Sequence, residues 1–270
     1  MAHDNFKPEI WSARILYNLR KNFVFSGLVN RNYEGEITKA GDTVHITTPT
    51  GITVNDYSGT VVYQTPGENQ QSLLIDQKKY WAFDVDDVDA VQANVELIDI
   101  NAEEAGVSMA DTVDQSIAGL YTAAGSTVAL NISANDNGVR AALLEAAEAL
   151  DDNNVPQAGR WLTVTPRVLR SIKGSPDYSV ASELGDTIKM TGALGMIEGF
   201  NVFMSRNVAV ATQHKCMFGT NAAITFAEQL VKTEALRREG SFADALRGLL
   251  VYGHKVVRPE ALGLLDVTVA

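Results

Sequence analysis

Hydrophobic and polar residues alternate along residues 40–83. Val44 and Ile46 fall on one side of the chain and His45 on the other, a period of two that is typical of a half-buried strand. After a stretch rich in turn residues, strand-like sequence returns at Leu73 and Ile75 and again at residues 80–85. The pattern predicts a long two-stranded β-hairpin. Because isolated hairpins are marginally stable at best, this one needs a surface to pack against.

A period of three or four residues follows and predicts a helix of about twenty residues between Asn101 and Gly125. About twenty helical residues make a rod roughly 30 Å long. Asn101, three residues before Glu104, fits a capping box at its start, and Gly125 ends it. The apolar stripe is formed by Ala102, Ala105, Met109, Val113, Ile117 and Leu120. The opposite face is acidic and holds Glu103, Glu104, Asp111, Asp114 and Gln115.

Helical and extended patterns alternate in the rest of the chain, which predicts an α/β region over residues 136–230. One helix is expected to begin at Asp136 or Asn137, and Thr165 followed by Pro166 marks the start of another. Strands are expected at residues 160–164, 200–205 and 215–218, a loop at 173–199, and closing strands over 231–270.

The N-terminal segment, residues 1–39, is predicted to be an arm. Pro8 suits the first turn of a helix, and Trp11, Ile15 and Leu19 then recur every four residues on one side. A helix this short is marginal in water unless its apolar stripe packs on its own chain or on a neighbour.

Composition narrows the class of protein. The chain has 270 residues, 46% of them hydrophobic, a formal net charge of −11 and a single cysteine, Cys216. These values exclude intrinsic disorder, an intrachain disulfide and a cysteine-rich metal site. Residues 84–152 hold fifteen acidic side chains and one basic one, whereas residues 1–39 hold six basic and four acidic ones. Each segment is either a solvated face or a surface that meets charged surfaces, including those of other copies.

Sequence motifs for enzyme chemistry are missing. There is no P-loop, dinucleotide-binding glycine pattern or nucleophile elbow, and the four histidines lie far apart. One acidic cluster invites a calcium site, but it lacks the glycine that an EF-hand loop requires. A solvated strand end is the favoured interpretation, and weak binding of divalent ions stays open. The cluster is Asp84, Asp86, Asp87 and Asp89. No catalytic residue, cofactor or metal ligand is predicted.

Seven short stretches carry a family resemblance. They are FKPEIWS, GEI, GDTV, DQKKYWAF, VDD, RGLLVYG and VVRPE, at residues 6–12, 35–37, 41–44, 76–83, 85–87, 247–253 and 256–260. Together with the order of arm, hairpin, long helix, α/β region and closing strands, they resemble the major capsid proteins of tailed bacteriophages, which have the Hong Kong 97-type fold. The resemblance covers nearly the whole chain.

The resemblance implies an α+β fold with five parts. They are an N-terminal arm (1–39), an extended β-hairpin loop (40–83), a peripheral domain (84–135) with a long spine helix near 99–124, an axial α/β domain (136–230) and a return to the peripheral domain (231–270). Such a protein assembles in the host cytoplasm, as pentamers and hexamers, into an icosahedral shell around double-stranded DNA. The implied partners are a scaffolding protein, a portal and decoration proteins, and no membrane is involved.

Two alternatives stay open. One is a bacterial nanocompartment shell protein with the same fold and a protein cargo, which a hydrophobic cargo groove would favour. The other, less favoured, is a soluble enzyme that uses the carboxylates of residues 84–89 with a metal ion. An enzyme of that kind predicts a metal-dependent activity in a small monomeric species.

The sequence departs from some family members in two ways. No lysine lies between Lys39 and Lys78, so the Lys–Asn cross-link that joins some capsids through the extended loop is not expected. No long helical leader precedes the arm, so we expect either a processed form or a separate scaffolding protein.

Two sets of residues are predicted to matter for assembly. Arm and hairpin side chains are expected to contact adjacent copies. The acidic helix face is expected to lie toward the inner wall, where it repels DNA because sequence-independent DNA binding needs Lys and Arg. The first set is Trp11, Arg14, Ile15, Tyr17, Val54, Tyr57 and Tyr63. The second is Glu103, Glu104, Asp111 and Asp114.

Overall fold

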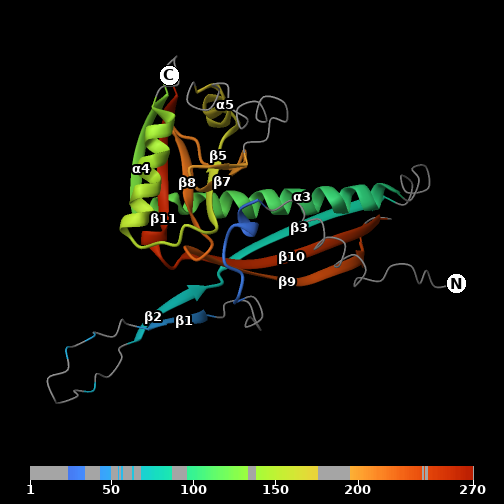
Figure 1. The fold of residues 1–270 in the computed structure, drawn as a ribbon. Coiled ribbons are helices and arrows are strands. Elements are labelled where there is room, and N and C mark those ends of the chain that lie inside the picture. Colours follow the sequence, from blue (N-terminus) through green and yellow to red (C-terminus); the bar gives the residue numbers. More distant parts are fainter. Residues whose placement is uncertain are drawn as a thin grey trace.

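The arrangement of helices and sheets comes from a computed structural model. It describes residues 24–33, 43–49, 54, 56, 63, 68–86, 96–132, 138–175, 195–238, 240 and 243–269. Within these residues the chain forms sheets of two, three and six strands and three α-helices (Figure 1). The six-stranded sheet and the three-stranded sheet each carry helices, and the two-stranded sheet projects from them (Figure 1).

The six-stranded sheet has the order β4-β11-β8-β5-β7-β6. Its strands are β4 (Ser126–Ile132), β11 (Leu262–Val269), β8 (His214–Thr220), β5 (Arg160–Val164), β7 (Phe200–Met204) and β6 (Met196–Ile197). β5 is buried at all its positions because it lies between β8 and β7 and is covered on its faces. The strands predicted at 160–164, 200–205 and 215–218 are therefore confirmed.

Two helices pack on this sheet. α4 (Val139–Asp152) buries Leu143 and Leu150 against β4 and β11. It follows Gly138, which has a φ of 101°, so the cap expected at Asp136 or Asn137 is wrong. α5 (Pro166–Gly174) begins as predicted, because the Val168 N–H donates to the Thr165 hydroxyl oxygen at 3.4 Å.

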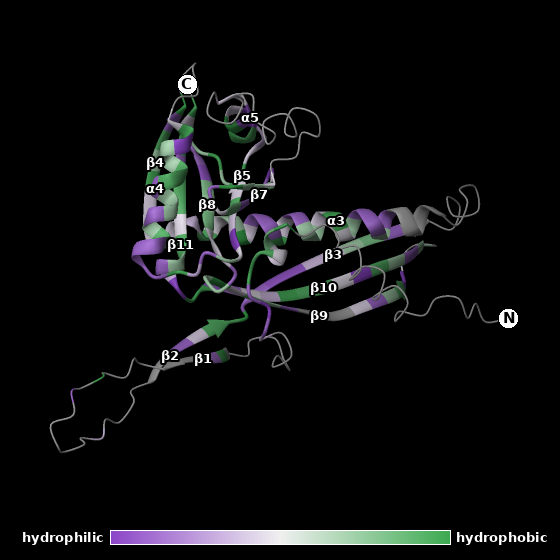
Figure 2. Cartoon of the chain, in the orientation of Figure 1, coloured by the Kyte–Doolittle hydropathy of each residue, from purple (hydrophilic) through white to green (hydrophobic). Residues whose placement is uncertain are grey.

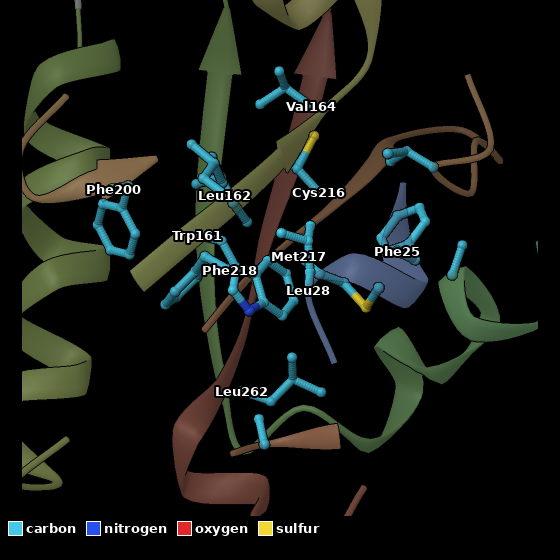
Figure 3. Packing of buried hydrophobic residues seen from close by; sticks show 14 of the residues in the cluster. Phe25, Leu28, Trp161, Leu162, Val164, Phe200, Cys216, Met217, Phe218 and Leu262 are labelled. Atoms are coloured by element: carbon cyan, nitrogen blue, oxygen red, sulfur yellow. The ribbon is translucent and has the colours of Figure 1, made fainter. Parts of the chain in front are cut away.

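Residues 24–33 belong to the body of the subunit. Phe25, in a short 3-10 turn (Phe25–Gly27), is fully buried and lies close to Met217 and Cys216, with Leu28 beside it (Figure 3). Asn30 then bridges to the start of the strand at Thr225. This part of the arm expected over 1–39 therefore packs on its own chain and not on a neighbour, because its apolar residues enter the chain's own core.

The three-stranded sheet, in the order β3-β10-β9, carries the long helix on one face (Figure 1). Its strands are β3 (Gln77–Asp86), β10 (Ala243–Val256) and β9 (Ile224–Arg237). The helix is α3 (Glu96–Ala118), continued by a 3-10 turn (Gly119–Ala123). The long helix predicted over 99–124 is confirmed, but Asn101 lies inside it and is exposed, so the capping box is wrong.

The predicted hairpin is shorter than expected. β1 (Thr43–Pro49) and β2 (Glu68–Leu74) pair in antiparallel register from Thr43↔Leu74 to Pro49↔Glu68 and project away from the body (Figure 1). The returning strand expected at Leu73 is confirmed as part of β2. Its continuation expected at 80–85 is wrong as part of this hairpin, because those residues lie in β3 and pair with β10. The alternating pattern marks a strand correctly but does not identify its partner.

The base of the hairpin is fixed to its own subunit. Side chains from β1, β2 and the residue after β2 form a second apolar cluster with β9, β10 and the segment after β10. Its members are Val44, Ile46, Leu73, Ile75, Ala227, Val251 and Val257. The Gln71 side-chain amide donates to the Val257 carbonyl at 3.1 Å, and the Lys255 ammonium donates to the Ser72 carbonyl at 3.0 Å. The hairpin therefore has an anchored base beneath its projecting end.

The sheets cross the domain boundaries expected at residues 135 and 231. β4, expected in the peripheral domain, and β11, expected to return to it, both pair within the six-stranded sheet. β9 spans residue 230 and lies wholly in the three-stranded sheet. Strands that are far apart in the sequence pair in the same sheet, so continuous sequence ranges do not separate the two sheets.

Gly253 lies where the hairpin base crosses β10. A Cβ there would stand 2.2 Å from the Leu74 carbonyl oxygen and 3.0 Å from the Ile75 Cα. Because both contacts are backbone, we expect Gly253→Ala to lower the free energy of unfolding by about 2–3 kcal/mol in urea denaturation. Gly119→Ala is the control, since its added methyl group meets nothing within 4 Å. Equal stabilities of the two variants would contradict this packing.

Candidate functional site

The far end of the hairpin exposes apolar side chains. Val54 is 94% exposed and Tyr63 is 92% exposed. Both were predicted to contact other copies, and in the single subunit both stand in water. The other predicted contact residues, Trp11, Arg14, Ile15, Tyr17 and Tyr57, lie outside the described part of the chain. Of the seven predicted contact residues, the structure therefore describes two, Val54 and Tyr63, and both belong to the projecting hairpin.

The three-stranded sheet has one covered face and one open face. On the covered face Trp81 lies directly over Gly248, where a Cβ would come within 2.5 Å of the indole, and stacks on Phe83 at 5.7 Å. We call the other side the open sheet face. It is a shallow groove of about 500 Å³ lined by Tyr80, Ala82, Glu234, Arg247, Gly248 and Leu249.

The open sheet face combines apolar surface with an ion pair. Tyr80 is 80% exposed, and the Arg247 Nε donates to a Glu234 carboxylate oxygen at 2.9 Å across the strands. Leu249 joins this groove to the apolar cluster at the hairpin base. An amphipathic groove next to a projecting apolar hairpin is a surface suited to another polypeptide segment.

The acidic face of α3 is partly as predicted. Glu103, Glu104 and Asp111 are exposed, and hydrophilic segments recur along the helix (Figure 2). Asp114 is a correction: it is 2% exposed and lies against the 3-10 turn. Its carboxylate accepts hydrogen bonds from the backbone N–H groups of Val24 and Phe25, at 3.3 Å each. Asp114 therefore fixes residues 24–25 to the long helix instead of facing solvent.

Burial dominates the protonation of Asp114. Loss of solvent raises its pKa from 3.8 to about 6, against the opposing effect of hydrogen bonds from Val24, Phe25 and Asn207, while the nearby charge of Asp111 raises it slightly further. The sequence contains an indication that Asp114 is buried. Asp114 lies three residues before Ile117, which places it at the border of the apolar stripe.

The raised pKa predicts a pH dependence of stability. Because the folded protein binds the Asp114 proton more tightly than the unfolded chain does, this group stabilises the fold at low pH, and the contribution is lost as pH rises through about 6. Between pH 5 and 7 we expect the wild type to lose about 1 kcal/mol relative to Asp114→Asn. Urea denaturation of both proteins measures this, and parallel pH profiles would contradict it.

The other candidate chemistry does not converge on a site. Asp84 forms an ion pair with Arg238, and Asp87 and Asp89 lie outside the described residues. Among the residues that the structure describes, no cluster of three His, Cys, Asp or Glu side chains could hold a metal ion. Cys216 is fully buried, and burial raises the pKa of its thiol to about 12. None of the described helices is long and apolar enough to cross a bilayer.

Comparison with known proteins identifies the family. The sequence profile of the phage capsid protein family matches residues 70–265, well over half of the chain. The chain belongs to the phage capsid protein family. A search of curated proteins finds no match.

Solved structures agree with this assignment. A chain from Mycobacterium phage Che8 is 29% identical, with a TM-score of 0.77 over 90% of both chains. The capsid structure of cyanophage P-SCSP1u is 16% identical, with a TM-score of 0.74 over 92% of this chain and 89% of that one. A virus-like particle from Pyrococcus furiosus is 16% identical, with a TM-score of 0.59 over 95% and 98%.

These findings confirm the resemblance drawn from the sequence. The protein has the α+β Hong Kong 97-type capsid fold, and its membership of the phage capsid protein family supports a structural role in a capsid shell.

Proposed function

We propose that the shell built from this chain encloses the double-stranded DNA of a tailed phage. Copies assemble as pentamers and hexamers in the host cytoplasm, with a scaffolding protein, a portal and decoration proteins as partners. The observation that carries the proposal is the hairpin, which is anchored at its base and holds Val54 and Tyr63 almost fully in water. A solitary molecule gains nothing from such an element, whereas a closed assembly buries it.

The hairpin of one copy docks on the open sheet face of the next. Val54 and Tyr63, together with Tyr57, contact the apolar part of the groove around Tyr80 and Leu249. Arm residues Trp11, Arg14, Ile15 and Tyr17 contact neighbouring copies in the same way. Each contact is weak alone, but many simultaneous contacts give a stable shell.

The acidic face of α3 lines the inside of the shell. Glu103, Glu104 and Asp111 are exposed, and α3 contains no Lys or Arg. Such a lining repels the DNA phosphates, so packaged DNA is held loosely and without sequence preference.

The test of this function is the content of purified virions. We expect nuclease-protected duplex DNA inside them, and no tight binding of a short DNA duplex by isolated subunits at roughly 0.1 M salt, measured by fluorescence anisotropy. Glu103→Lys/Glu104→Lys is the matched variant and should bind the duplex more tightly. Particles that hold a protein cargo and no DNA would instead support the nanocompartment alternative, and tight duplex binding by wild-type subunits would contradict the proposed lining.

A further inference from the structure

The last residues of β7 form an apolar surface that the described part of the chain leaves uncovered. Phe203 and Met204 are both exposed, although successive side chains of a strand point to opposite faces of the sheet. Met196 of β6 is exposed too and lies on the same face as Phe203, because it pairs with Asn201, two residues earlier. Apolar surface that extends over several neighbouring side chains marks a site for another macromolecule.

An exposed cation follows this apolar surface. Within the residues that the structure describes, no hydrogen bond or ion pair joins the Arg206 guanidinium to another group. The backbone on both sides of Arg206 is held, since the Ser205 N–H donates to the Val164 carbonyl at 3.0 Å and the Asn207 N–H donates to the Ser205 hydroxyl oxygen at 3.1 Å. The side chain of Arg206 is therefore available to another molecule. We define the β7 end as Met196, Phe203, Met204 and Arg206.

α4 presents the opposite charge on the side that faces away from the six-stranded sheet. Leu144, Glu145 and Glu148 are exposed, and Glu148 lies three and four residues after the other two, which places all three on one side of the helix. In the described part of the chain, the carboxylates of Glu145 and Glu148 form no ion pair or hydrogen bond. We call these three residues the outer side of α4. It combines an apolar side chain with two carboxylates, as the β7 end combines apolar side chains with a guanidinium.

The two surfaces lie at different places on the subunit. α4 packs on β4 and β11, at one end of the strand order of the six-stranded sheet, and β7 lies near the other end (Figure 1). The Arg140 Nε donates to Glu198 at 3.1 Å, which joins the first turn of α4 to the turn before β7 and leaves the other end of β7 free. Complementary surfaces at two places on one chain make a head-to-tail contact, which closes into a ring when the rotation between copies allows.

We propose that the β7 end of one copy packs against the outer side of α4 on the next copy in a ring. The inference rests on the proposed shell function and adds the surfaces that orient the copies. The apolar side chains of the β7 end contact Leu144, and the Arg206 guanidinium pairs with Glu145 and Glu148. One guanidinium can serve two carboxylates because its five N–H donors form a planar fork. The opposite charges fix the register of the contact and exclude other orientations.

Cross-linking in assembled particles tests the contact directly. Cys216 is fully buried, so a short bis-maleimide reacts only with introduced thiols, and the wild type is the control for this. Glu148→Cys/Arg206→Cys should give a ladder of covalent multimers, whereas each single variant gives monomers. Particles of this double variant without multimers would overturn the inference. An equal ladder from Glu148→Cys/Arg170→Cys, which moves one thiol to an exposed position on α5, would overturn it as well.

Charge reversal measures what the contact contributes to assembly. Arg206→Glu should lower the yield of particles at least about tenfold, because it places three like charges together across the interface. Adding Glu145→Arg/Glu148→Arg to this variant should restore most of the yield. Arg170→Glu is the matched control, since Arg170 is exposed but lies outside the contact, and should assemble as the wild type does. Circular dichroism checks that all variants fold.

The outcomes separate this inference from the shell function. A wild-type yield of particles from Arg206→Glu, or no recovery in the combined variant, overturns the contact between the β7 end and α4 and leaves the shell function intact. A wild-type protein that forms neither rings nor shells contradicts the proposed function and, with it, the contact.

Discussion

Replacing both Val54 and Tyr63 with aspartate abolishes shell formation and leaves the subunit folded. In the isolated subunit the two side chains are 94% and 92% exposed, so the thermal midpoint should stay within the range of an ordinary surface substitution. In the shell each aspartate would bring a carboxylate into an apolar contact, at a cost of several kcal/mol. Because the contact recurs in every copy, the loss is multiplied over the whole assembly.

Light scattering and electron microscopy measure shell formation by the double aspartate variant, and differential scanning calorimetry measures the thermal midpoint of its subunit. Asp56→Asn is the control, since Asp56 lies in the same stretch, is exposed and carries no apolar surface. Normal shells from the double aspartate variant would show that the hairpin end does not contact a neighbour. A large drop in the thermal midpoint would show that it packs on its own subunit.

Truncation at two nearby positions gives the second large effect. A chain that starts at residue 23 should fold but form no shell, whereas a chain that starts at residue 29 should not fold. Phe25 is fully buried and Leu28 is 7% exposed, and the N–H groups of Val24 and Phe25 donate to Asp114. Loss of a buried Phe alone costs about 3–5 kcal/mol, a large share of the roughly 5–15 kcal/mol that stabilises a typical domain.

Circular dichroism and thermal melting separate the two truncations, and electron microscopy detects shells. Phe25→Ala in the full chain should reproduce most of the destabilisation of the longer deletion. If the shorter deletion forms normal shells, the proposed role of Trp11, Ile15 and Tyr17 is refuted. If the longer one melts at the wild-type temperature, the packing of Phe25 is contradicted.

Local patterns predicted the elements whose environment is set by their own sequence. The helix over 99–124 is long and has an apolar residue at every third or fourth position, and Thr165–Pro166 combines a cap with a residue that suits only the first turn. The strand at 160–164 is a short apolar run after a turn. In these cases the sequence of the element alone is enough to predict it.

Elements that depend on distant partners were missed or misplaced. β9 (Ile224–Arg237) includes Ala, Glu, Gln, Leu and Lys, which favour helix, and it is extended because it pairs with β10 over its whole length. β3 was assigned to the hairpin because its partner, β10, begins at Ala243, far along the chain. The local sequence of a strand does not indicate a partner that lies so far along the chain.

The functional residues divide in the same way. The exposure of Val54 and Tyr63 agrees with the predicted hairpin, since neither finds a place in its own core. Asp114 was assigned to the polar face, because nothing in the sequence places the 3-10 turn at Phe25–Gly27 against the helix.

Electron cryomicroscopy of shells assembled from the full chain tests the central claim most directly. We expect closed particles in which Val54 and Tyr63 of each copy lie on the open sheet face of a neighbour, next to Tyr80 and Leu249. A solitary monomer in which residues 50–67 fold back onto their own body would contradict it.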